Sequence, residues 1–338
     1  MPHRIGNQTV GLDSCPVIVA SAAVGGKKEH EGPLAPYFDI LCDDTTFGEA
    51  SWEKSESRLQ QLALEKALEK GDLASTDIQY LFAGDLLNQC IGSAFAAKDN
   101  NMPFIGLYGA CSTMAESLGL AACFVEGGLT TCCAALTSSH FCSSERQFRF
   151  PLEYGSQRTP TAQWTATAAG AAVLKSQGDG PAVKAVTFGK IKDLGITDMN
   201  NMGAAMAPAA ADTISAYFTD TGAKLTDYDV ILTGDLGQVG SSLLYQLLDE
   251  QSIDIRKQHK DCGLLLYDQQ KQGVNAGGSG CGCAASVLCG YVLEGMRKNQ
   301  WNNILFIATG ALLSTVSVQQ GSAIPGIAHL IHISNVKA

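Results

Sequence analysis

Cysteine 111 is the residue whose setting is best suited to chemistry. It follows an apolar run typical of a strand, residues 105–108, and the small residues Gly109 and Ala110. It precedes residues 112–125, which have the apolar spacing of a helix. Backbone amides at the beginning of a helix favour negative charge, so this thiol is a candidate nucleophile and the amides are a candidate anion site. The alternative is an inert cysteine buried in the turn.

The other cysteines do not predict a metal site. The chain has 12 cysteines, without a CxxC pair and without regular spacing to histidine. The pairs 132/133 and 281/283 are too closely spaced for a structural zinc site. The first residues lack the pattern of a signal peptide or a membrane anchor. We therefore expect reduced thiols in a protein of cytoplasmic origin, most of them in the core.

Composition narrows the function classes. The chain has 338 residues, of which 46% are hydrophobic and 17% charged, enough apolar mass for a large core. The net charge of −10 argues against binding to nucleic acid, which requires clustered Lys and Arg.

The sequence contains an internal duplication. Three pairs of matching segments recur in the same order: 80–86 and 230–236, 109–127 and 280–295, and 132–137 and 304–309. The offset of roughly 150 residues is too long for a solenoid repeat. We predict two duplicated halves, residues 1–200 and 201–338.

Each half reads as alternating strands and helices. Predicted strands are 78–83, 104–108, 132–137, 230–233, 264–267 and 304–309, and predicted helices are 51–70, 112–125, 241–251 and 283–296. Apolar strands of this kind favour a mostly parallel sheet covered by helices, and two stacked halves give an α/β fold with αβαβα layers. The polar segment 141–164, with Pro151 and Pro160, is predicted to be an insertion over one face.

Several motifs resemble the thiolase and ketoacyl synthase superfamily. The segment 109–113 (GACST) between its strand and helix, 134–139 (AALTSS) and 169–174 (AGAAVL) match the nucleophile region and a following strand. Residues 280–286 (GCGCAAS) align with a helix-opening turn of the ketoacyl synthase III branch. The resemblance implies a thiolase-like fold built from two duplicated halves.

Further blocks are more specific. They are 31–34 (EGPL), 84–89 (GDLLNQ), 145–151 (ERQFRFP), 193–198 (DLGITD), 206–212 (MAPAAAD) and 309–314 (TGALLS). Together they resemble the stage V sporulation protein AD family of endospore-forming bacteria. The resemblance implies a role in sporulation and germination: movement of dipicolinic acid, largely as its calcium chelate, into the forming spore and out again.

The catalytic partners of the superfamily are missing. Condensing enzymes combine the cysteine with His and Asn or with two His. The first histidine should follow the strand 230–233, where Asp235 stands, and the Asn position holds Cys281. His140 is expected to bond locally, and His259, in a charged stretch, to be solvated. We therefore predict a non-catalytic protein. The alternatives are an active acyl-CoA or ketoacyl transferase that uses Cys111, and a thiol or metal protein.

The resemblance also implies a pocket for a planar aromatic dicarboxylate. Such a ligand needs amide donors, cations or a shared calcium ion, and an apolar slot. The predicted ligand-binding residues are Cys111, Asp85, Asn88, His140, Arg146, Arg149, Asp198, Asp235 and Cys281. For Asp85 and Asp235 the alternative is helix capping. No cofactor is predicted beyond calcium carried with the ligand.

The last expectations concern geometry and assembly. An internal pseudo-twofold would bring the helices that begin at Cys111 and Cys281 to one pocket. Relatives form homodimers, which implies that the strand 132–137 pairs with its symmetry mate. Because the sequence has no membrane span, the expected partners are the other membrane proteins of the stage V sporulation A operon, with peripheral attachment to the spore inner membrane.

Overall fold

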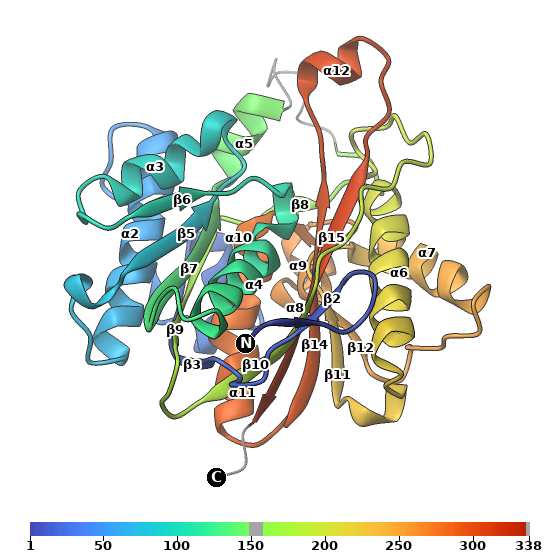
Figure 1. Cartoon of the computed structure of the whole chain (residues 1–338). Helices are drawn as coiled ribbons and strands as arrows, with labels where there is room; N and C mark the ends of the chain where they lie inside the picture. The colour runs from blue at the N-terminus through green and yellow to red at the C-terminus, as the bar shows by residue number, and fades with distance from the viewer. Residues whose placement is uncertain (149–157, 336–338) are drawn as a thin grey trace.

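The computed structural model describes residues 1–148 and 158–335, and ten of the fifteen strands in these ranges form two groups of five (Figure 1). The other five are short: β1 (His3–Arg4), β2 (Thr9–Gly11), β4 (Ile40–Leu41), β8 (Trp164–Thr165) and β13 (Gly278–Ser279). The first group contains β3 (Val17–Gly25), β5 (Tyr80–Gly84), β6 (Phe104–Gly106), β7 (Cys132–Ser139) and β9 (Ala168–Lys175). The second contains β10 (Pro181–Thr187), β11 (Val230–Thr233), β12 (His259–Asp261), β14 (Asn303–Ala311) and β15 (Gly326–Asn335). One aligned pair, Ala182 with Val17, joins β10 to β3.

The strand order confirms the duplication. The full order is β12-β11-β14-β15-β10-β3-β9-β7-β5-β6. In each group the first strand along the chain pairs with the fifth, the fifth with the fourth, the fourth with the second, and the second with the third. The predicted division at residue 200 stays a prediction, although β10 lies with the strands of the later half.

The helices form three layers around these strands. The outer layer on one side contains the long helix α2 (Trp52–Lys70), and the outer layer on the other side contains α6 (Met202–Thr221) and α7 (Gly237–Asp249). The central layer contains α4 (Thr113–Glu126), α10 (Cys281–Ser286) and α11 (Leu293–Arg297). A π-helical turn, Val287–Val292, joins α10 to α11. Shorter helices are α1 (Lys27–His30), α3 (Ile91–Ala97), α5 (Phe141–Phe148), α8 (Cys262–Leu266), α9 (Gln269–Gln272) and α12 (Thr315–Gln319).

Three apolar clusters fill the spaces between the layers. Leu59 and Leu64 of α2 pack on one face of the first group of strands. Leu118 of α4 and Leu288 of the central helical segment pack between the two groups. Ile214 of α6 belongs to the cluster on the outer face of the second group. The predicted αβαβα arrangement is confirmed, and burial on both faces explains why the strands read as continuous apolar runs.

Two expectations about the sheet are wrong. The sheet is mixed: β5 and β11 have parallel neighbours, whereas β9 and β15 pair antiparallel to theirs. The chain returns from β14 to β15 as a hairpin, which requires antiparallel pairing. The predicted strand 264–267 belongs largely to α8, because the Asp261 carboxylate caps that helix by accepting the Leu264 N–H at 3.2 Å.

The predicted dimer strand is also wrong. Strand β7, which contains residues 132–137, pairs with β5 on one side and with β9 on the other. Both of its edges are therefore occupied within the chain. The outer strand of this group is β6. Among the described residues, no helix has the length and apolar character needed to cross a membrane.

Candidate functional site

Cys111 lies in a strained turn between β6 and α4. The 3₁₀ turn Ala110–Ser112 opens with Ala110 at φ +49°, a left-handed conformation that is costly for a residue with a Cβ. The Ser112 hydroxyl donates to the Gly109 carbonyl at 2.7 Å. A Cβ added to Gly310 of β14 would lie 2.3 Å from that same carbonyl, so only glycine allows β14 to approach the turn. The turn is thus fixed from two sides.

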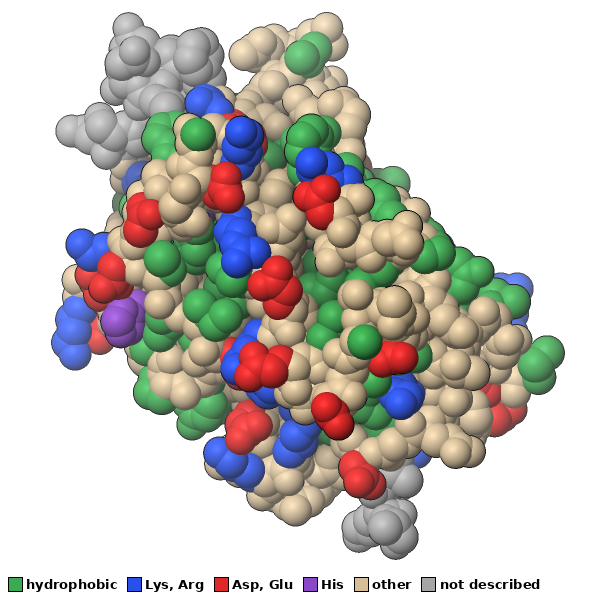
Figure 2. Space-filling view, turned by 90° about the vertical axis from the view of Figure 1, so that its left-hand side faces the viewer, with side chains coloured by type: hydrophobic (Ala, Val, Ile, Leu, Met, Phe, Trp, Pro, Cys, Tyr) green, Lys and Arg blue, Asp and Glu red, His purple; other side chains and the backbone are tan. Residues whose placement is uncertain are grey.

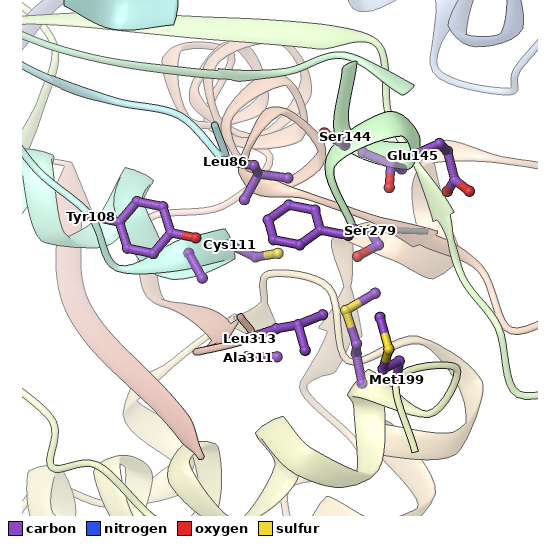
Figure 3. Close-up of a pocket in the computed structure, with 13 residues that line it drawn as sticks. Leu86, Tyr108, Cys111, Ser144, Glu145, Met199, Ser279, Ala311 and Leu313 are labelled. Carbon is purple, nitrogen blue, oxygen red and sulfur yellow. The ribbon is translucent and has the colours of Figure 1, made fainter. Parts of the chain in front are cut away.

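A narrow pocket opens above Cys111 (Figure 3). Its walls are mainly apolar and come from both halves: Leu86, Tyr108, Ala110, Cys111, Ser144, Glu145, Phe148, Thr165, Met199, Met202, Ser279, Ala311 and Leu313. The cavity volume is about 60 Å³, on a measure in which one water molecule takes roughly 10–15 Å³. The pocket therefore has room for several waters, and a larger ligand requires lining side chains to move.

Asp235 and Cys281 lie beside Cys111. Asp235 follows β11 and is fully buried, and its carboxyl oxygens accept hydrogen bonds from the Gly280 N–H at 2.9 Å and the Thr309 hydroxyl at 2.9 Å. The Cys111 thiol also interacts with this carboxyl group. Cys281 belongs to the same small buried cluster as Cys111. The structure therefore brings the two cysteines together, as the pseudo-twofold predicts.

Burial controls the protonation of Cys111 and Asp235. Desolvation raises the pKa of Cys111 well above that of an ordinary thiol, and the nearby Asp235 and Cys281 raise it further. Burial likewise raises the pKa of Asp235 to about 7. The expectation that the helix amides favour a thiolate is wrong, because desolvation and a neighbouring carboxyl group outweigh the helix field.

Asp85 occupies the equivalent turn of the first half and caps it. Its carboxylate accepts hydrogen bonds from the Leu87 N–H at 2.8 Å and the Ser93 N–H at 2.7 Å, and it is fully buried. It does not line the pocket. The helix-capping alternative describes these contacts, since Ser93 lies in the first turn of α3 and also donates its hydroxyl to Asp85 at 2.6 Å.

Sequence reasoning missed Glu56, a buried acid behind Cys281. Its carboxyl group accepts hydrogen bonds from the Ser143 hydroxyl at 2.8 Å and the Ser138 hydroxyl at 3.2 Å, and the Cys281 thiol donates to the Ser138 carbonyl at 2.8 Å. Burial raises the pKa of Glu56 well above its usual range. The sequence does contain one indication of this burial. Glu56 lies three residues before Leu59 in α2, and residues at this spacing share a helix face, here the buried apolar one.

Two predicted oxygen donors lie outside the pocket. Asn88 is exposed and lines an adjoining outer hollow that shares Tyr108, Phe148 and Leu313 with the pocket. Asp198 is exposed, and its carboxylate accepts the Asn200 N–H at 2.9 Å, which closes a local turn.

Of the predicted basic residues, the two that the structure describes are not brought to the pocket. His140 is buried, with Nε2 2.8 Å from the Thr45 carbonyl, and its Nδ1 accepts the Cys142 N–H at 3.2 Å, which is the predicted local bond. Arg146 is exposed and pairs with Glu53, its guanidinium lying 5.2 Å from the centre of the Trp52 ring. Arg149 lies outside the described residues. None of the chain's six histidines, all of them within the described ranges, lines the pocket.

His259 also departs from expectation. It is half-buried rather than solvated, because Nε2 lies 2.9 Å from the Thr233 hydroxyl and Nδ1 lies 2.7 Å from the Tyr245 hydroxyl. Its burial lowers its pKa to about 4. Across residues 1–148 and 158–335, no group of three or more His, Cys, Asp or Glu side chains is placed to hold a metal ion.

Comparison with known proteins gives the family. Residues 6–334 match the model of the family described as Stage V sporulation protein AD (SpoVAD). The chain belongs to this family. It is 44% identical over 315 residues to the Stage V sporulation protein AD of Bacillus subtilis (strain 168), covering 93% of each chain. The family resemblance inferred from the sequence blocks is confirmed.

Solved structures give the fold. An OleA variant from Xanthomonas campestris superposes with a TM-score of 0.62 at 12% identity, covering 95% of this chain and 98% of that one. The 3-oxoacyl-[acyl-carrier-protein] synthase III of Aquifex aeolicus VF5 superposes with a TM-score of 0.56 at 11% identity, covering 94% and 99%. This member of the SpoVAD family therefore has the thiolase-like fold, with Asp235 and Cys281 beside its cysteine.

Proposed function

We propose that this chain binds dipicolinic acid in the pocket above Cys111, supports its uptake into the spore and its release at germination, and catalyses no reaction. One observation supports the proposal that the chain is not an enzyme. The group beside the Cys111 thiol is a buried carboxyl, Asp235, whose proximity favours the protonated thiol. A condensing enzyme needs a base that favours the thiolate and donors that stabilise an oxyanion.

The ligand assignment draws on the family and on the shape of the pocket. Leu86, Phe148 and Leu313 provide apolar walls for a planar ring. The lining residues Tyr108, Thr165 and Ser279 provide hydroxyl groups for polar contacts. Because the cavity is narrow, entry of the ring requires movement of half-buried side chains such as Phe148.

The second candidate is an acyl-CoA or ketoacyl transferase. It is favoured by the left-handed turn that holds a cysteine at the bottom of a pocket in a thiolase-like fold. The raised pKa of Cys111 argues against it. The two candidates differ in whether a thioester reacts, which is the subject of the first experiment in the Discussion.

Filling the pocket should weaken ligand binding. We expect Leu313→Trp to weaken dipicolinate binding at least tenfold, because the larger side chain occupies the space needed by the ring. The control is Val316→Trp, at an exposed position that lines the outer hollow and not the pocket. Calorimetric titration with dipicolinate, with and without calcium, and with pyridine-2-carboxylate measures the effect. Equal affinities of Leu313→Trp and the parent would place the ligand elsewhere.

The cellular setting is proposed from the family. We place the chain at the spore inner membrane, peripherally attached, with other membrane proteins of the stage V sporulation A operon as partners. Fractionation of spores, followed by salt washing of the inner membrane, tests this placement. Recovery of the chain only in the spore core would contradict it.

We propose a homodimer that pairs through β6 in place of the excluded β7. Phe104 on β6 and Ile91 and Phe95 on the neighbouring α3 are exposed apolar residues. Figure 2 views this side of the molecule, where hydrophobic side chains lie among charged ones. An outer strand with exposed apolar neighbours is suited to pairing with a second copy.

Phe104→Asp should convert the dimer to a monomer, because it places a charge at the centre of this surface. Light scattering at micromolar concentration measures the mass. Leu129→Asp, an exposed leucine in the turn before β7, is the matched control and should stay dimeric. A parent protein that is monomeric at this concentration would contradict the assembly and leave the pocket unaffected.

A further inference from the structure

A second cavity, called the Lys28 hollow below, is lined by residues of α1, of the first turn of α5 and of β8 (Figure 1). Its volume is about 310 Å³, against about 60 Å³ for the pocket above Cys111, and no described residue lines both. Phe141 at the beginning of α5 lines the hollow, whereas later residues of this helix line the pocket. Successive side chains of a strand point to opposite sides, so Trp164 of β8 lines the hollow and Thr165 lines the pocket. The Lys28 hollow is therefore a separate cavity.

Lys28 is a half-buried cation that the structure holds in a fixed position. Its Nζ donates to the Gln272 carbonyl at 2.8 Å and lies 4.1 Å from the centre of the Trp164 ring, and Gln272 Nε2 donates back to the Lys28 carbonyl at 2.7 Å. An ammonium group has three N–H donors, and neither a carbonyl nor a ring supplies a negative charge. Lys28 forms no ion pair with a carboxylate of residues 1–148 or 158–335, and its burial lowers its pKa. A cation in this setting is stabilised by an anion that enters the hollow.

The acids that line the hollow do not cancel its positive charge. Glu29 is fully buried, and its carboxyl group accepts hydrogen bonds from the Tyr267 hydroxyl and from two backbone N–H groups at 3.1 Å. Burial raises the pKa of Glu29, which favours its neutral form. The other acid, Glu31, is exposed. Since Lys27 and Lys28 both line the hollow, two cations face one surface carboxylate, and the hollow favours a ligand with a single negative charge.

The rest of the lining is suited to a flat apolar body. The Phe141 and Trp164 rings stack at a centroid distance of 4.0 Å and form an aromatic wall. The Thr167 hydroxyl also lines the hollow, and it accepts the Phe141 N–H at 3.1 Å, which leaves its proton for a ligand. We propose that the Lys28 hollow binds an aromatic monocarboxylate, whose carboxylate is held by Lys28 and Thr167 and whose ring packs against the aromatic wall. This site is independent of the proposed function, which concerns the other pocket.

Calorimetric titration of the full chain with 2-naphthoate and with its neutral analogue 2-naphthamide tests the site. We expect the parent to bind the carboxylate at least tenfold more tightly than the amide, because only the carboxylate forms charge-assisted hydrogen bonds with Lys28. In Lys28→Met, which keeps the unbranched stem beside Trp164 and removes the ammonium group, the ratio of the two affinities should approach one. Lys224→Met removes an exposed lysine outside both cavities and should leave the ratio unchanged.

Two further measurements locate the ligand. Acetylation of the parent by acetic anhydride, followed by peptide mass spectrometry, reports the access to each lysine. Saturating 2-naphthoate should slow the acetylation of Lys28 at least fivefold and leave that of Lys224 unchanged, and this measurement covers the case in which Lys28→Met fails to fold. Leu313→Trp, which fills the pocket above Cys111, should bind 2-naphthoate as tightly as the parent, because Leu313 does not line the Lys28 hollow.

The contrary results are distinct. An unchanged ratio in folded Lys28→Met overturns the inference, as does a parent in which 2-naphthoate fails to protect Lys28. Loss of 2-naphthoate binding in Leu313→Trp would place this ligand above Cys111 and also overturns it. A parent that does not bind 2-naphthoate but binds dipicolinate would contradict the Lys28 site and leave the proposed function standing, whereas the reverse pattern would contradict the proposed function alone.

Discussion

Incubation of the protein with acetyl-coenzyme A should give no turnover, and Cys111 should remain predominantly unmodified. The thiol is buried, and its pKa is raised by desolvation and by Asp235 and Cys281. No histidine of the described chain lines the pocket to accept its proton. A reaction that depends on the rare thiolate without an oxyanion site lacks most of the roughly 10⁶-fold or greater acceleration typical of enzymes. Intact mass spectrometry and release of free coenzyme A measure the two steps.

The same experiment on Cys111→Ala assigns any mass shift that does occur. Acylation that persists in this variant belongs to one of the other cysteines and says nothing about the pocket. Rapid, stoichiometric acylation that depends on Cys111 and is followed by turnover would reinstate the acyl transferase and contradict the non-catalytic proposal.

The duplication made much of the fold predictable. Because β5 and β11 are followed by matching turns, the sequence placed Asp85 and Asp235 at equivalent positions, and the structure gives them equivalent buried environments. The same symmetry put Cys111 and Cys281 in one cluster. The strand directions were less accessible, because an apolar run does not specify whether its neighbour is parallel or antiparallel.

The polar part of the site could not be derived in the same way. Arg146 and Arg158 lie in a segment without periodic patterning, so nothing in the sequence indicated which carboxylate each would meet. The tertiary structure pairs Arg146 with Glu53 on the surface and Arg158 with Glu145 behind the pocket wall. His140 and His259 are likewise fixed by partners distant in sequence, Thr45 and Thr233.

The stability of the protein should fall as the pH rises from about 5 to 8, and Asp235→Asn should remove a large part of this fall. Burial raises the pKa of Asp235 to about 7 in the folded chain, whereas an aspartate in an unfolded chain titrates near 4. Between these values the folded state holds the proton and the unfolded state has lost it, so the free energy of unfolding decreases with rising pH. Below about pH 4 both states are protonated and the loss vanishes. Above about pH 7 the loss is complete, at roughly 4 kcal/mol for this group.

Urea unfolding at several pH values measures the difference between Asp235→Asn and the parent. The variant carries a constant cost of roughly 1–3 kcal/mol, because its amide cannot reproduce every hydrogen bond that the Asp235 carboxyl group accepts from Gly280, Ser279 and Thr309. Its free energy of unfolding should nevertheless gain about 2–3 kcal/mol on the parent between pH 5 and 8, since the amide does not ionise. Asp198→Asn, at an exposed turn, is the control and should leave the pH profile of the parent unchanged. Parallel profiles for Asp235→Asn and the parent would mean that Asp235 is already ionised at pH 5 and that its pKa is not raised; its negative charge would then disfavour the Cys111 thiolate over the whole pH range.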